Sequence, residues 1–382
     1  GFSAGGEMSS LIAYMVEEAP IERVGLVSAS LSMILTSSLF LANGVVKLTT
    51  CIVGDAAMLA WGWRVPFVAA LAPGLISVWG RWTFPESELF LRELEQRCWQ
   101  AGPTPVASKG HAQDAGGEAQ RGGCVATCGS DEDAQTSRVP SFLCLHWRAV
   151  LVCVGSLVNY AAIAYVAGLW CVSFLTTHGM SPSMALSASL LAKALCSIVM
   201  LPAGWICDQV GVGTMVLVGG VATMAVGLPT WLAISASPTG TVAFFGVSVG
   251  FSLPHLFFCH HLFCAELFPT SLRGLGVGIG WNISMGVFGG FGGLLAQASL
   301  QVGSSGPGWL ISGSGLVTVV TVLWARHLER RGLLQLTHIR CAPYWGPAPP
   351  TGVADGVAAK ARPPSAGPTP APTCGRLPVE SA

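Results

Sequence analysis

The chain has 382 residues, of which 52% are hydrophobic and only 10% are charged, and its mean hydropathy is +0.60. Soluble domains carry about 25% charged residues, so this composition indicates a membrane protein that crosses the bilayer several times. The formal net charge of zero leaves no basic face to neutralise phosphates, which argues against nucleic acid as a partner.

Nine apolar stretches follow one another along the chain, and a helix needs about 20 such residues to span a bilayer. They cover residues 1–16, 26–46, 64–81, 149–175, 185–206, 214–234, 241–265, 274–300 and 308–326. The sequence therefore predicts an all-α polytopic membrane protein with about nine transmembrane helices. Because the first stretch is short and starts at Gly1 without a start methionine, we expect that it is cut at its beginning.

The polar segments divide the chain into four parts. Residues 1–88 are expected to form a partial N-terminal helical bundle, 89–147 a cytoplasmic loop, and 148–330 a C-terminal bundle of six helices. Residues 331–382 are rich in Pro, Ala and Gly and are expected to be a disordered cytoplasmic tail.

Lysine and arginine residues predict the orientation, since they accumulate on the cytoplasmic side. If the turn at 17–25 is cytoplasmic, only Lys47 and Arg64 fall outside. The residues that then fall inside are Arg23, Arg81, Arg92, Arg97, Lys109, Arg121, Arg138, Arg148, Arg273, Arg326, Arg330 and Arg331. The central loop and the C-terminus are therefore expected in the cytoplasm. We expect the plasma membrane, with an organelle membrane as the alternative.

One short polar turn occurs twice, from Glu18 to Gly25 and from Glu266 to Gly274, each time between two apolar stretches. Such a repeat is typical of secondary transporters built from two related parts. The second copy joins the fourth and fifth of six spans, so three further spans are expected before Gly1, in a parent of six plus six. Arg23 and Arg273 are expected to hold helix-end carbonyls or a facing carboxylate at these gating turns, with Glu18 and Glu266 as partners.

Four motifs occur in the order found in one transporter family. They are Gly1-Phe2-Ser3-Ala4-Gly5-Gly6-Glu7, Trp61-Gly62-Trp63-Arg64-Val65-Pro66-Phe67, Pro85-Glu86-Ser87-Glu88-Leu89-Phe90, and Ala265-Glu266-Leu267-Phe268-Pro269-Thr270 with Arg273 and Asn282. Together they resemble the major facilitator superfamily, and within it the metabolite:proton symporters that include proline/betaine, shikimate, citrate and 2-oxoglutarate transporters. The resemblance implies a twelve-helix bundle and transport by alternating access.

The loop Gly204–Gly213 departs from the superfamily's pattern G-x-x-x-D-[RK]-x-G-[RK]-[RK]. It keeps Asp208 and both glycines but none of the basic residues. We therefore count Asp208 among the gating residues and expect a weaker charge contact at this loop than the family pattern implies.

Polar residues on five spans are expected to lie at one depth, because a helix rises about 1.5 Å per residue from its polar end. They are Glu7, Asn159, Lys193, His255 and Asn282. Secondary transporters bind substrate near the bilayer midplane, and ionisable groups there are costly and usually functional.

The roles assigned to these residues are hypotheses with structural alternatives. Glu7 and His255 are the proton-coupling candidates, although a carboxylate or histidine can also be held structurally. Lys193, Asn159, Tyr160 and Asn282 are the substrate-binding candidates. Lys193 can instead pair with Glu7 or snorkel, and Tyr160 can simply pack. The neighbouring His260 and His261 are expected at the membrane interface.

The sequence predicts a proton-coupled symporter of a small organic acid, amino acid or betaine, acting as a monomer and not as an enzyme. One alternative is an uncoupled facilitator or exchanger of sugars or organic ions. Another is a truncated, sensor-like protein that does not transport. No cofactor or metal is expected, because Cys124 and Cys128 lack a second ligand pair and most other cysteines lie in apolar stretches.

Overall fold

The computed structural model describes residues 2–83, 138–257 and 259–336 of the chain, and these residues are helical for most of their length. They belong to one compact unit, Gly1–Ala348. Most of the predicted central loop and of the C-terminal tail lies outside the described residues. The division into two bundles of helices stays a prediction.

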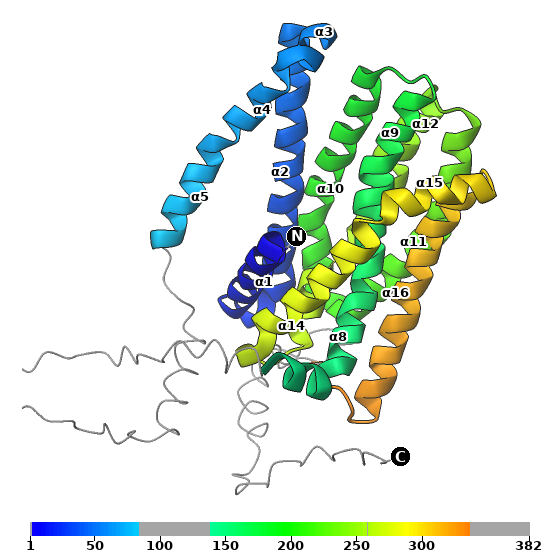
Figure 1. The fold of residues 1–382 in the computed structure, drawn as a ribbon. Helices are drawn as coiled ribbons and strands as arrows, with labels where there is room; N and C mark the ends of the chain where they lie inside the picture. The colour runs from blue at the N-terminus through cyan, green and yellow to red at the C-terminus, as the bar shows by residue number, and fades with distance from the viewer. Residues whose placement is uncertain (1, 84–137, 258, 337–382) are drawn as a thin grey trace, which may run out of the picture. The chain divides into compact units, whose positions relative to one another are not determined.

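The helices follow the predicted apolar stretches, with breaks inside several of them, but α8 already begins at Arg138, within the predicted central loop (Figure 1). The elements before the central loop are α1 (Phe2–Glu17), η1 (Ile21–Arg23), α2 (Val24–Val53), α3 (Asp55–Ala57), η2 (Met58–Gly62), α4 (Arg64–Ala69) and α5 (Leu71–Thr83). Those after it are α8 (Arg138–Ala162), η3 (Ile163–Trp170), α9 (Cys171–Thr177), α10 (Pro182–Val210), α11 (Val212–Ala236), α12 (Thr241–Ser248), η4 (Gly250–Phe257), α13 (His260–Glu266), α14 (Thr270–Ile283), η5 (Ser284–Gly289), α15 (Gly292–Val302) and α16 (Gly306–Arg330).

Helix ends coincide with residues that favour them. The Ser181 side chain caps the start of α10 by accepting a hydrogen bond from the Met184 N–H at 3.3 Å, with Pro182 next in the chain. Gly54 and Gly211 follow α2 and α10 with φ of 81° and 87°, a region that glycine adopts without strain. Local sequence thus sets the bounds of the two helices that later form the centre of the site.

Within the described ranges, six helical stretches are long and apolar enough to cross a membrane, and a pair bent by 58° between Asp55–Gly62 and Arg64–Gly80 makes a possible seventh. The predicted span 241–265 is not one continuous helix. It consists of α12, the 3₁₀ segment η4 and α13, and Pro254 lies inside the 3₁₀ segment. Proline has no N–H to donate and clashes with the preceding turn, which disfavours a regular α-helix. Pro202 and Pro229, by contrast, lie inside the continuous helices α10 and α11.

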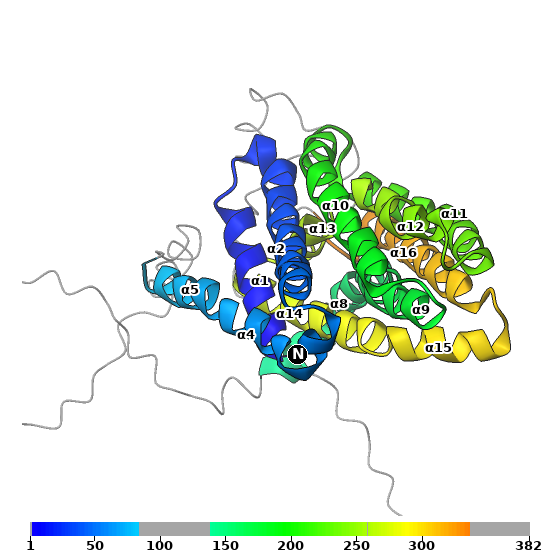
Figure 2. The same ribbon diagram turned by 90° about the horizontal axis from the view of Figure 1, so that it is seen from above.

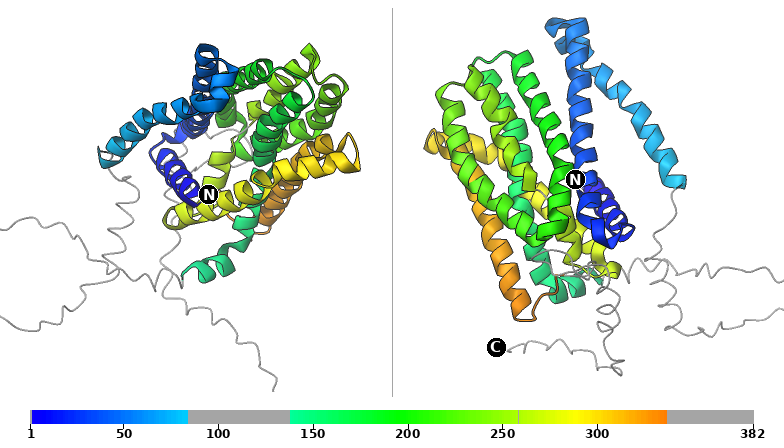
Figure 3. Two further views of the ribbon diagram at one scale, coloured as in Figure 1. Left: turned by 45° about the horizontal axis from the view of Figure 1, so that its top comes forward. Right: turned by 180° about the vertical axis from the view of Figure 1, so that it is seen from behind.

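Many large apolar side chains are exposed, as expected for surfaces that face lipid rather than water. Along α5, Leu75, Ile76 and Trp79 are all exposed. Figures 1 and 3 show α4 and α5 running outside the other helices. The view in Figure 2 shows α2 beside α10 and α1 beside α14, and the first of these pairs lines the cavity described next.

Candidate functional site

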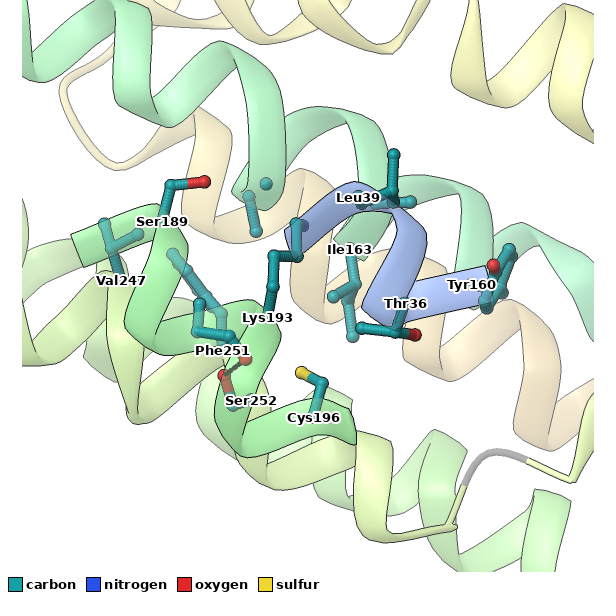
Figure 4. A pocket seen from close by; sticks show the side chains of 14 residues that line it. Thr36, Leu39, Tyr160, Ile163, Ser189, Lys193, Cys196, Val247, Phe251 and Ser252 are labelled. Carbon is teal, nitrogen blue, oxygen red and sulfur yellow. Dashed lines mark hydrogen bonds between the residues drawn. The ribbon is translucent and has the colours of Figure 1, made fainter. Parts of the chain in front are cut away.

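A cavity lies between α2, α8, η3, α10, α12 and η4 (Figure 4). The space that it encloses is small, about 50 Å³, and the cavity is partly open to solvent. The polar side chains that the described residues place on its wall are Thr36, Tyr160, Ser189, Lys193, Cys196 and Ser252.

Lys193 is the only charged side chain among the described residues that line this cavity. Its ammonium approaches the π-helix η3, since a Cβ on Gly168 would lie 3.1 Å from Lys193 Nζ. Nζ makes no hydrogen bond or ion pair with any residue that the structure describes. A partly buried cation without a counter-ion is costly, so this wall is suited to an anionic group of a ligand.

Tyr160 connects the cavity with a cluster of aromatic rings. Its ring centroid lies 5.6 Å from that of Trp281, 6.0 Å from His261 and 6.3 Å from His260. His261 Nδ1 lies 2.7 Å from the hydroxyl of Ser32 on α2. The cluster therefore connects a cavity-lining residue of α8 to α13, α14 and α2.

The end of α10 that carries Asp208 is hydrogen-bonded to the first turn of α2. The Asp208 carboxylate accepts hydrogen bonds from the backbone N–H groups of Gly25 at 2.7 Å and Leu26 at 3.0 Å. A helix N-terminus carries unpaired N–H groups and a partial positive charge, so a carboxylate there is stabilised. A Cβ on Gly204 would lie 2.5 Å from Ala29 Cβ, which shows how closely the two backbones approach.

A buried ion pair joins α1 to α14 in the same region as the second copy of the repeated turn. Arg273 donates to the Glu17 carboxylate, to the Ala265 carbonyl at 3.2 Å and to the Thr270 hydroxyl at 3.3 Å. The side chains of Arg273 and Glu17 are 1% and 5% exposed, so water screens this pair little. The two repeated turns are thus held by different charge contacts.

The opposite ends of α2 and α10 are also in contact. The Lys47 ammonium donates to the Ser183 carbonyl and hydroxyl, each at 2.9 Å, and to the Ser187 hydroxyl at 2.6 Å. Helices α2 and α10 are therefore bonded at both ends, and the cavity lies beside the segment between these contacts.

The structure brings only some of the predicted binding and coupling residues together. Lys193 and Tyr160 share the cavity wall. Asn159 is fully buried, its side chain has no hydrogen-bond partner among the described residues, and it is not part of the described wall. Asn282 donates to the Gly278 carbonyl of its own helix at 2.9 Å. Glu7 lies exposed on α1, and His255 lies in η4, where its side chain is outside the described part. The predicted roles of all six residues stay predictions.

Among the predicted gating residues, Asp208 and Arg273 make the contacts described above. Glu18 and Arg23 are exposed in the first turn, whereas Glu266 is fully buried. Arg273 forms its ion pair with the carboxylate of Glu17. The sequence interpretation did not select Glu17 as a gating residue. The sequence pattern alone does not distinguish Glu17 from Glu18. Which of them faces α14 depends on how α1 is rotated about its axis.

His261, Ser32 and Lys47 are further residues that sequence reasoning missed. His260 and His261 are 1% and 2% exposed inside the bundle, and the expectation that they lie at the membrane interface stays a prediction. A signal existed, because two adjacent histidines within an apolar stretch are expensive unless other protein groups surround them. No feature of the sequence indicated the partner of the Ser32 hydroxyl or the contact made by Lys47.

The described residues form a helical fold with six stretches that are long and apolar enough to cross a membrane, and they enclose a cavity between helices. The family model "Sugar (and other) transporter" matches residues 1–325. The chain belongs to this family of the major facilitator superfamily, so it is a multi-pass integral membrane protein and not an enzyme. The predicted superfamily and helical fold class are confirmed.

Curated relatives include transporters of small solutes. The glycine betaine/proline/ectoine/pipecolic acid transporter OusA of Dickeya dadantii is 26% identical over 75% of this chain and 52% of its own length. The ectoine/proline transporter ProP of Corynebacterium glutamicum is 27% identical over 79% and 56%. The shikimate transporter of Escherichia coli is 23% identical over 78% and 61%. The chain thus spans about half the length of the relatives it matches.

A solved structure supports the fold independently. The proton:xylose symporter XylE bound to 6-bromo-6-deoxy-D-glucose matches with a TM-score of 0.54 at 18% identity. The match covers 86% of this chain and 68% of that one. At this identity the likeness shows the fold, and the substrate of that protein carries no weight for this chain.

Proposed function

We propose that the protein is a proton-coupled symporter of a small solute that carries a carboxylate, such as an amino acid, a betaine or an organic acid. The observation that carries this proposal is the Lys193 ammonium, which faces the cavity without a counter-ion among the described residues. A ligand carboxylate would provide that counter-ion, and charge-assisted hydrogen bonds are among the strongest in proteins.

The rest of the cavity suits a small, partly apolar solute. Ser189 and Cys196 lie one turn before and one turn after Lys193 on the same face of α10, and Phe251 and Ile163 provide apolar wall. The relatives support the same class of solute. OusA is a transporter of glycine betaine, proline, ectoine and pipecolic acid, ProP is a transporter of ectoine and proline, and a third relative is a shikimate transporter.

The contacts of α2 with α10 support alternating access. The cavity is accompanied by the Asp208 contact at one end and by the Lys47 contact at the other. Rocking of one group of helices against another, in the way that secondary transporters move, would break one of these contacts at a time. We place the Asp208 end in the cytoplasm, because most lysines and arginines of the sequence are expected on that side. A monomer in the plasma membrane is retained as a prediction. Glu7 and His255 are carried forward as proton-coupling candidates.

Uptake by the purified full chain in proteoliposomes tests the function. Labelled proline, betaine and shikimate are offered with and without an imposed pH gradient, and counterflow is measured in parallel. We expect gradient-dependent accumulation of at least one of them. Lys193→Gln removes the charge at similar size and should weaken binding by roughly tenfold to a hundredfold, as for loss of a charged hydrogen bond. Accumulation that ignores the pH gradient would instead indicate a facilitator.

His178→Asn is the control, because His178 is exposed and is not part of the cavity wall. It should retain most of the uptake of the unmodified protein. Equal uptake by Lys193→Gln and the unmodified protein would refute the carboxylate-binding role of Lys193.

A further inference from the structure

His261 joins three helices beside the cavity. Its ring is 2% exposed and lies with its centroid 5.3 Å from that of Trp281 on α14, in a stacked arrangement with an angle of 24° between the ring planes. The same ring faces Tyr160, which lines the cavity, at 6.0 Å. Its Nδ1 lies 2.7 Å from the Ser32 hydroxyl on α2. A change in the charge or position of this ring therefore affects both the cavity wall and the contact between α2 and α13.

The two ring nitrogens of His261 are in different situations. Nδ1 has the Ser32 hydroxyl as its partner, whereas Nε2 is buried and has no hydrogen-bond partner among the described residues. A neutral imidazole carries one N–H, but an imidazolium has two and needs an acceptor for each. A charge buried without a partner or water is strongly disfavoured. The observed packing of α2 against α13 therefore favours the neutral ring.

The charged and titratable groups of the surrounding helices do not change this conclusion. Facing the ring, α8 contributes Tyr160, α14 contributes Trp281 and α2 contributes the Ser32 hydroxyl. On α1 and α14, Glu17 and Arg273 bond to each other. Helix α13 itself carries the adjacent His260 and the buried Glu266, and α11 carries no titratable side chain. None of the contacts described here brings a carboxylate to Nε2.

We propose that His261 links proton binding to the separation of α2 from α13 and from the end of α10 that carries Asp208. Separation admits water to Nε2, so the protonated ring favours the separated arrangement and the neutral ring favours the observed one. A ligand shifts a two-state equilibrium by its preference for one state, and here the proton is that ligand. The inference rests on the proposed function, because it makes His261 a positioning residue for proton-coupled transport.

Distance measurements by electron paramagnetic resonance test the inference on the full chain in detergent or nanodiscs. Nitroxide-bearing non-canonical amino acids at the exposed positions Glu22 and Gln209 report the separation of η1 from the end of α10 and leave all 13 cysteines unmodified. Between about pH 8 and pH 5, where histidine changes charge, we expect the separated population of the unmodified protein to rise by roughly tenfold.

Two variants make the test specific. In His261→Asn the amide keeps a partner for Ser32 but cannot titrate, so the populations should no longer depend on pH. In Ser32→Ala the neutral ring loses its partner, so separation should begin at a less acidic pH. His178→Asn is the control, because His178 is exposed and stacks on Phe174, away from α2. It should behave like the unmodified protein.

The results separate this inference from the proposed function. Unchanged pH dependence in His261→Asn, identical curves for Ser32→Ala and the unmodified protein, or no pH dependence in the unmodified protein would each overturn the role of His261. In proteoliposomes, His261→Asn should retain counterflow and lose accumulation driven by the pH gradient. Absence of counterflow in the unmodified protein would refute transport but not the distance result, which requires no transport.

Discussion

Replacement of Gly25 by alanine gives a sharp test of the contact between α2 and α10. A Cβ at this position would lie 2.6 Å from Asp208 Oδ1 and 2.9 Å from the Gly204 carbonyl oxygen. Both distances are shorter than real Cβ contacts allow, and the second neighbour is backbone. The added methyl group must therefore displace the Asp208 carboxylate, the α10 backbone or both.

The size of the effect follows from two costs and one gain. Overpacking costs about 1–3 kcal/mol, and weakening the charged hydrogen bonds of Asp208 adds roughly 1.5–3 kcal/mol. Replacing glycine by alanine in a helix returns up to about 1 kcal/mol. A net cost of about 1.5 kcal/mol or more shifts the equilibrium away from the observed contact by roughly tenfold or more.

Gly44→Ala is the matched control on the same helix, because nothing lies within 4 Å of the Cβ it would add. The assay measures two quantities for both variants in detergent. These are the distribution of distances between labels at Glu22 and Gln209, and the melting temperature. Gly25→Ala should shift the distance distribution towards separation, and Gly44→Ala should leave it unchanged with equal or slightly higher stability. Identical distributions in the two variants would refute the close-packing argument.

Further predictions concern charged residues elsewhere in the protein. Arg273→Ala removes the cation beside the buried Glu17 carboxylate and should lower stability by about 3–5 kcal/mol. The double variant with Glu17→Ala should melt at a higher temperature than Arg273→Ala alone; a lower value would contradict the ion-pair argument. Glu7→Gln should lose accumulation driven by the pH gradient but retain counterflow, and a normal gradient response would remove Glu7 from the coupling candidates. Lys47→Met should change stability by less than about 1 kcal/mol, because exposed contacts contribute little. It should nevertheless speed maleimide labelling of Ser183→Cys; unchanged labelling would argue against a contact that closes this end.

The helices could be predicted from the sequence because hydropathy and length dominate the folding of chains in lipid. The superfamily followed from motifs around Glu7, Trp61, Pro85 and Glu266, and the family match confirms it. The break in the span 241–265 had a signal in Pro254, but hydropathy averages over single residues and treated the stretch as one helix.

Side-chain contacts were less predictable, because they depend on helix rotation and on distant segments. Lys193 was selected as a deep cation, and the structure places it in the cavity wall. The bond between Ser32 and His261 joins residues 229 positions apart, and serine in an apolar helix has no pattern that reveals its partner. Selecting Glu17 over Glu18 likewise requires knowing which face of α1 meets α14.

The approach of α2 to α10 also constrains how this sequence can vary over time. Gly25, Ala29, Gly204 and Asp208 occupy one small volume, although the chain separates the first two from the last two by more than 170 positions. A larger side chain at one of these positions is tolerated only if another becomes smaller or moves. Substitutions at these four positions should therefore occur together in related sequences. A substitution that destabilises the contact alone becomes tolerable when a second one restores the packing.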